Sequence, residues 1–139
     1  MSAHHETVAR IRQAYEHWHA ARGGDPKIWL DLMADHVTMR SLASAAEIIE
    51  GHRGKEIAER YFAAVSSDWE MLDMHAEEFI TQGDRLVVIG HVKFRYRKTG
   101  KVVESPKIDI YRLKDGQIVD FFDFFDTARA FAATLPDPA

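Results

Sequence analysis

Lys107, Asp109 and Asp123 are three charged residues in two strand-like segments that also carry many apolar side chains, and Asp123 lies within the aromatic run 121–125. A carboxylate among aromatic side chains loses its water, which raises its pKa, whereas a neighbouring lysine lowers it again. Such opposed effects can give a carboxyl group the pKa that a general base needs. These residue types therefore predict acid–base catalysis by Lys107, Asp109 and Asp123, and a buried structural ion pair is the alternative.

The elements that must position these residues follow from the periodicity of the sequence. Strand-like segments cover 71–81, 85–97, 102–113 and 117–125, with turn signals at 82–84, 99–100 and 114–116. Helical spacing covers 8–22 and 54–66, a short helix follows Pro26, a short strand covers 35–40, and a last helix begins near Thr127. Helices packed on one side of an antiparallel meander make an α+β domain, and the long sheet can curl around a cone-shaped pocket.

The expected turn lengths decide which side chains share a face of the sheet, because a one-residue error turns every side chain over. A two-residue loop at Thr99-Gly100 pairs Phe94 with Ser105, and a three-residue loop at 114–116 pairs Lys107 with Asp123. One face then collects the charged candidates among small and apolar residues: Val88, Gly90, Val92, Phe94, Ser105, Lys107, Asp109, Tyr111, Phe121, Asp123 and Phe125. The other face is mostly charged, which predicts a solvated surface or a polar dimer interface.

Residues outside the central strands complete the expected pocket. Tyr15 can donate a hydrogen bond to a substrate carbonyl, although core packing is the alternative for it and for the tryptophans. His75 faces the pocket if Gly83-Asp84 is a two-residue turn, and a surface histidine is the alternative. The loop 41–53 can line or gate the mouth. The substrate-binding residues that we expect are Tyr15, Trp18, Trp29, Met39, Ser41, His75, Val92, Phe94, Ser105, Tyr111, Phe121 and Phe125.

Composition excludes several classes of protein. The chain has 139 residues, with 18 Lys and Arg against 22 Asp and Glu, and no cysteine. This length predicts a single domain over 1–139, and the mild negative charge argues against a nucleic acid partner. No membrane segment or signal peptide is evident, so we expect a cytoplasmic protein. Thiol chemistry is excluded, and the histidines lack the spacing of a helical zinc pair, so no metal site is expected.

Several short motifs together resemble one family. The segments 115–119 and 122–128 resemble the closing strand of SnoaL-like proteins, which belong to the nuclear transport factor two-like superfamily. Segments 53–57, 34–37 and 83–88 resemble the third helix, first strand and central turn of that family. The resemblance implies a cone-shaped, curved antiparallel sheet wrapped over three N-terminal helices, with an enclosed pocket, a homodimer, and chemistry that needs no metal or cofactor.

The resemblance also implies a range of activities, among them those of polyketide cyclases, ketosteroid isomerases, limonene epoxide hydrolases and dehydratases, besides non-catalytic binding. Asp123 matches the aspartate with which the epoxide hydrolases activate water. Those enzymes also need an Arg-x-Asp on the central strand, where this chain has Gly90-His91-Val92-Lys93, so epoxide hydrolysis is not expected.

The favoured hypothesis is a cofactor-independent cyclase, isomerase or dehydratase that acts on a hydrophobic, carbonyl-bearing small molecule. Asp123 would be the base, Lys107 or Tyr15 would stabilise the developing oxyanion, and Asp109 would orient the base or share its proton. The alternatives are a non-catalytic binder of an apolar ligand in the same pocket, and an interaction module that pairs with another protein through its sheet.

Overall fold

The computed structural model describes residues 4–42 and 54–138 and has the predicted order of elements. The helices are α1 (His5–Ala20), α2 (Lys27–Leu32), α4 (Lys55–Asp68) and α5 (Thr127–Ala133). The strands are β1 (Met33–Ser41), β2 (Trp69–Gln82), β3 (Arg85–Tyr96), β4 (Val102–Lys114) and β5 (Gln117–Phe125). Most of the expected loop 41–53 lies outside the described residues.

The N-terminal helix buries the face that its spacing predicts and ends at a glycine. Ile11, Tyr15 and Trp18 of α1 are buried in the core. After the helix, Gly23 takes a φ of +76°, a left-handed conformation that favours glycine, and its N–H donates to Trp18 O at 3.0 Å. This turn reverses the chain, so that α2 packs back against α1. The two helices bring Tyr15 and Trp29 together edge to face, with ring centroids 4.9 Å apart.

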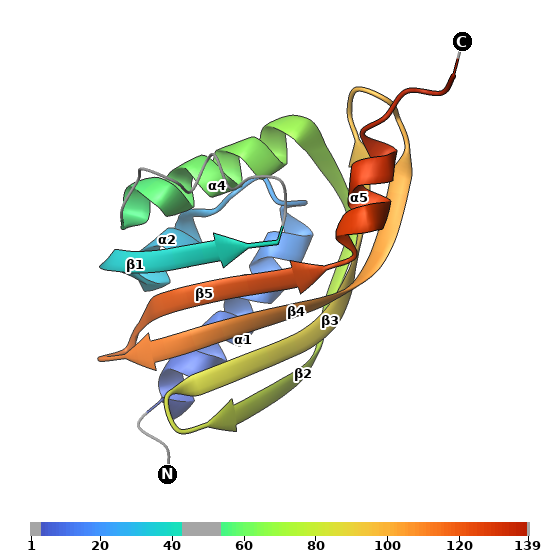
Figure 1. Ribbon diagram of the computed structural model, residues 1–139. Coiled ribbons are helices and arrows are strands. Elements are labelled where there is room, and N and C mark those ends of the chain that lie inside the picture. Colours follow the sequence, from blue (N-terminus) through green and yellow to red (C-terminus); the bar gives the residue numbers. More distant parts are fainter. Residues whose placement is uncertain (1–3, 43–53, 139) are drawn as a thin grey trace.

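The sheet is open and has the strand order β1-β5-β4-β3-β2. Strands β2 to β5 form the predicted antiparallel meander, and β1 joins it in parallel to β5. The sheet is strongly curved, and α1, α2 and α4 lie together on one side of it (Figure 1). The α+β cone wrapped over three N-terminal helices is therefore confirmed, with the parallel edge strand as an addition.

Both predicted turns around β4 have a different length from the one expected. Tyr96 N donates to Lys101 O at 2.8 Å, so the β3–β4 loop has four residues and Phe94 lies opposite Val103 rather than Ser105. The β4–β5 turn has two central residues, Asp115 and Gly116, both with positive φ, as a type I′ hairpin requires. A bulge follows this turn, and Asp109 rather than Lys107 lies opposite Asp123. Each shift amounts to two residues, so the predicted faces are kept.

The prediction for His75 is wrong because of a bulge in β2. Gly83-Asp84 is the two-residue turn expected, since Gln82 pairs with Arg85. An extra residue at Glu77 then turns the strand over, so that His75 lies opposite His91 instead of Val92. The side chain of His75 is 50% exposed and lies on the opposite face from the predicted pocket residues.

The C-terminal helix α5 stands against the far end of the curved sheet (Figure 1). Asp126 caps it by accepting a hydrogen bond from Arg129 N at 3.0 Å. Its other end is tied to the β3–β4 loop, because Thr99 Oγ1 donates to Ala133 O at 2.6 Å and Lys101 Nζ donates to Leu135 O at 2.7 Å. These contacts hold α5 over the open end of the cone.

Candidate active site

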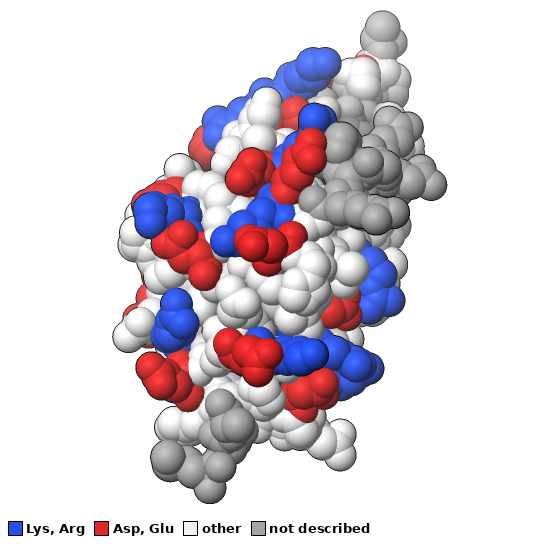
Figure 2. All heavy atoms as spheres, turned by 90° about the vertical axis from the view of Figure 1, so that its left-hand side faces the viewer, with Lys and Arg blue, Asp and Glu red and all other residues white. Residues whose placement is uncertain are grey.

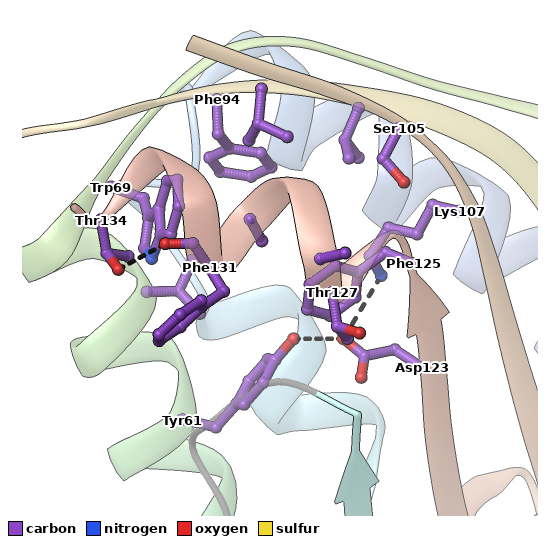
Figure 3. Close-up of a pocket in the computed structure, with 15 residues that line it drawn as sticks. Tyr61, Trp69, Phe94, Ser105, Lys107, Asp123, Phe125, Thr127, Phe131 and Thr134 are labelled. Carbon is purple, nitrogen blue, oxygen red and sulfur yellow. Dashed lines mark hydrogen bonds and ion pairs between the residues drawn. The ribbon is translucent and has the colours of Figure 1, made fainter. Parts of the chain in front are cut away.

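A cavity on the concave side of the sheet has a volume of about 410 Å³, within the range of small-molecule sites. It lies between the end of α4, the inner face of β3 and β4, and α5. Most of its lining is apolar, and Figure 3 shows Phe94, Trp69 and Phe131 around one end of it, with Lys107 and Asp123 at the other. The fold therefore encloses an apolar chamber with one charged end.

Asp123 is the most completely buried charged residue of the described chain, with a side chain only 1% exposed. Its Oδ2 accepts a hydrogen bond from Tyr61 Oη at 2.7 Å and lies 3.7 Å from Lys107 Nζ (Figure 3). Within residues 4–42 and 54–138, no group donates a hydrogen bond to Oδ1. A buried carboxylate with one oxygen unpaired is costly for stability, and such groups are common where a protein does chemistry.

Lys107 joins the two buried carboxylates. Its Nζ donates to Asp109 Oδ1 and forms an ion pair with Asp123. Burial acts to lower the pKa of Lys107, but the charges of Asp109 and Asp123 outweigh it, so the pKa is raised and the side chain stays cationic. Burial raises the pKa of Asp109, and the charge of Asp123 adds to this, although Lys107 opposes it. The cluster therefore holds one cation against two carboxyl groups.

A smaller inner cavity of about 60 Å³ lies behind this cluster, and Lys107 and Tyr61 line both cavities. Tyr15 Oη donates to Asp109 Oδ2 at 2.5 Å, and Tyr111 Oη, 2.6 Å from Tyr15 Oη, donates to it in turn. Burial, together with the charge of Asp109, raises the pKa of both tyrosines well above its usual value. The phenols therefore act as hydrogen-bond donors that support Asp109.

The structure brings most of the predicted site residues together, in two groups. Val92, Phe94, Ser105, Lys107, Asp123 and Phe125 line the main cavity. Tyr15, Trp18, Trp29, Lys107, Asp109, Tyr111 and Phe121 line the inner one. Three predicted residues line neither cavity: Met39 is in the core at 2% exposure, Ser41 lies opposite Asp123 in the β1–β5 register, and His75 is on the outer face.

Two parts of the lining were not predicted. Tyr61 is the residue that donates to Asp123, and its hydroxyl on the apolar face of helix 54–66 is a signal that could have identified it. Helix α5 contributes Thr127, Ala130 and Phe131, and Phe131 is 61% exposed. Nothing in the sequence of this short helix distinguishes a cavity wall from a terminal turn, because its role depends on how far the sheet curls.

The described helices do not include one that is long and apolar enough to cross a membrane. Figure 2 shows basic and acidic side chains interspersed over the face that it presents, so the described part of that face has no extended patch of one charge.

Comparison with known proteins agrees with this architecture. The family model of the SnoaL-like domain matches residues 11–121, and no curated protein matches the chain. An NTF2-like protein from Burkholderia thailandensis E264 is 23% identical, with a TM-score of 0.80, and the match covers 98% of this chain and 100% of that one.

Two further solved structures share the fold. A proposed SnoaL-like polyketide cyclase from Jannaschia sp. CCS1 is 19% identical, with a TM-score of 0.75, over 95% of this chain and 93% of that one. A protein of ketosteroid isomerase-like fold from Catenulispora acidiphila, solved with trimethylamine, is 16% identical, with a TM-score of 0.72, over 99% and 96% of the two chains. With the family model matching most of its length, the chain belongs to the SnoaL-like domain family.

Proposed function

We propose that this protein is a cofactor-independent acid–base enzyme of the cyclase, isomerase or dehydratase type, and that its substrate is a hydrophobic small molecule with a carbonyl group. The observation that carries the proposal is the buried carboxylate of Asp123, beside the cation of Lys107, at the charged end of an apolar cavity. Apolar walls select a hydrophobic substrate, and the paired charges give that substrate a base and an electrophile.

In the proposed mechanism, Asp123 removes a proton from the carbon next to the substrate carbonyl. Its Oδ1 accepts no hydrogen bond from any described residue, and its Oδ2 lies between Tyr61 and Lys107. The electrons of the broken C–H bond move to the carbonyl oxygen, and Lys107 stabilises the resulting enolate. Asp123 then returns the proton to a different carbon in an isomerisation, or to a leaving hydroxide in a dehydration. Asp109, held by Tyr15, orients Lys107.

A non-catalytic binder of an apolar ligand is the second candidate, and the internal pairing of the cluster favours it. Lys107, Asp109 and Tyr61 already have partners within the protein, as a structural network would. The neighbour from Catenulispora acidiphila, solved with trimethylamine, is a protein of this fold that holds a small ligand. A binder would retain its affinity without the Asp123 carboxylate and would form no product.

The first test uses 2-tetralone, a bicyclic ketone, and measures deuterium uptake at its α-carbons in D₂O by NMR. The wild-type protein is expected to accelerate the exchange over buffer. Ala130→Trp places an indole in the cavity from α5 and is expected to abolish the acceleration, whereas Ala132→Trp, on the exposed side of the same helix, is expected to retain it.

The outcome separates the two candidates. Exchange that Ala130→Trp removes supports the enzyme, since it places the reaction in the cavity. Binding of 2-tetralone that Ala130→Trp removes, with no exchange in the wild type, supports the binder. Exchange that is equal in both tryptophan variants contradicts a reaction in this cavity.

We further propose that the protein is a homodimer that pairs through the outer face of the sheet, and that it is cytoplasmic. This face carries Ile108, which is 37% exposed, and the stacked rings of Phe122 and Phe124, 4.3 Å apart. Exposed apolar groups on an open sheet favour an interface between proteins. Ile108→Arg is expected to convert a dimer into a monomer in sedimentation equilibrium, and Glu59→Ala, an exposed change on α4, is expected to leave the dimer intact. A wild-type monomer would contradict this.

A further inference from the structure

Three side chains with metal-binding atoms meet at the outer edge of the sheet, away from the cavity. They are Asp73, His75 and His91, whose ligand atoms all lie within 4.8 Å of one another. His75 Nε2 is 3.0 Å from Asp73 Oδ2, and the rings of His75 and His91 are 4.8 Å apart. Two ligands of a tetrahedral zinc ion are separated by about 3.3 Å when the bonds are 2.0–2.1 Å long, so small side-chain movements would complete such a site.

The backbone at this place is irregular in a way that builds the cluster. Bulges at Leu72 and Glu77 flank the segment that carries Asp73 and His75. The second bulge turns His75 onto the face of His91, directly opposite it. Gly90, next to His91, lies so close to β2 that a Cβ there would be 1.8 Å from His75 O. An irregular, glycine-dependent backbone therefore sets the two imidazoles side by side.

The groups around the cluster are those that orient metal ligands. His91 Nδ1 contacts Glu77 Oε1 at 2.7 Å, and Glu77 is the extra residue of the bulge. A proton on Nδ1 donates to this carboxylate and leaves the lone pair on Nε2, which is the arrangement that metal-binding histidines usually show. His19, from α1, contacts the other carboxylate oxygen of Asp73 at 3.1 Å. The contact with Glu77 therefore orients His91, and the contact with His19 orients Asp73.

The charges and the exposure of the cluster suit a divalent ion. Asp73 and Glu77 are acidic. The cations around them are Arg22, 3.2 Å from His19 Nε2 and bonded to Leu72 O, and Lys93, which lies opposite Asp73 and forms an ion pair with Glu104. The side chains of Asp73, His75 and His91 are 37%, 50% and 47% exposed, so an ion can enter from solvent. Two imidazoles with a carboxylate favour zinc and similar transition metals over magnesium or calcium, which prefer oxygen ligands alone.

We propose that Asp73, His75 and His91 bind a zinc-class divalent ion that links β2 to β3, with Glu77 and His19 as positioning residues. Water completes the coordination, because three protein ligands leave one tetrahedral position open. No metal site was expected from the sequence, because its histidines lack the spacing of a helical zinc pair. The two histidines of this cluster come instead from two paired strands. None of the three ligands lines the main cavity, so zinc binding can be tested separately from the proposed enzyme activity.

The test is titration of the full chain with zinc chloride by calorimetry, and with Co²⁺ by visible absorption. One zinc ion per chain is expected, together with the intense visible bands of four-coordinate Co²⁺. His75→Ala and His91→Ala are each expected to weaken zinc binding at least about tenfold. Glu77→Gln is expected to weaken it about 10- to 100-fold, because a neutral amide replaces the carboxylate that orients His91.

Two control variants test whether other imidazoles are responsible. His17→Ala removes a histidine that also pairs with a carboxylate, Asp25 at 3.0 Å, but is not part of the three-residue cluster. His4→Ala/His5→Ala removes the adjacent pair near the N-terminus. Both controls are expected to bind zinc as the wild type does. The proposal is wrong if the wild type binds no zinc, or if His75→Ala and His91→Ala both retain its affinity.

Discussion

Asp123→Asn is expected to slow the α-deuteration of 2-tetralone by about 10²- to 10⁴-fold, the range that a positioned general base contributes. The amide has nearly the shape of the carboxylate, and its oxygen can still accept the hydrogen bond of Tyr61 and face Lys107. The amide nitrogen then takes the place of Oδ1. Because no described residue donates a hydrogen bond to Oδ1, the N–H groups of the amide do not face another donor there. The variant therefore removes the base and keeps the packing around it.

Asp120→Asn is the matched control for this variant. Asp120 lies on the same strand but on the outer face, where it accepts hydrogen bonds from Thr38 and Arg40. Its replacement is expected to leave the exchange rate unchanged. If Asp123→Asn also keeps the wild-type rate, while its circular dichroism matches that of the wild type, Asp123 is not the base. If it keeps its affinity for 2-tetralone and neither protein catalyses exchange, the binder is supported.

The faces of the sheet could be predicted from the sequence even though both turns around β4 were given the wrong length. A face depends only on whether a register shift is odd or even, because side chains alternate along a strand. The β3–β4 loop is longer by two residues, and at β5 a shorter turn and a bulge near Val119 add up to two. Lys107, Asp109 and Asp123 therefore reach the same face, although the pairs across the strands differ.

The same rule explains why His75 could not be placed. Its turn has the predicted length, so only the single bulge at Glu77 separates the predicted face from the observed one. A bulge adds one residue, and neither the turn signal nor the alternation of the strand fixes its position. The contribution of α5 to the cavity could not be predicted from the sequence either, because it depends on the curvature of the sheet and on the hydrogen bond from Thr99 to Ala133.

The second large effect is expected on stability, from the loss of the cation in the cluster. Lys107→Met keeps the length of the side chain and leaves Asp109 and Asp123 buried without a positive partner. Removing one partner of a buried ion pair typically destabilises a protein by about 3–5 kcal/mol, because the remaining charge has lost both its water and its counter-ion. The free energy of unfolding, measured with urea at neutral pH, is expected to fall by that amount.

This loss should depend on pH, since it arises from the charge of a carboxylate. Burial already raises the pKa of Asp109 in the wild type, and the removal of Lys107 raises it further. A carboxyl group whose pKa is higher in the folded than in the unfolded protein destabilises the fold above its unfolded pKa, about 3.9, and this penalty fades as the pH falls towards that value. The difference between wild type and Lys107→Met is therefore expected to be largest at neutral pH and to shrink in acid.

Two further variants distinguish this explanation from a simple loss of packing. Lys93→Met removes a lysine that is 42% exposed and lies 3.7 Å from Glu104, and such surface pairs contribute only about 0–1 kcal/mol. Lys107→Met/Asp109→Asn removes a buried carboxylate together with the cation, so it is expected to be more stable than Lys107→Met alone. If the double variant is instead less stable, and the loss in Lys107→Met is the same at every pH, the lysine stabilises the fold through its methylene groups rather than its charge. Lys107 would then have no electrostatic role in holding Asp109 and Asp123 ready for chemistry.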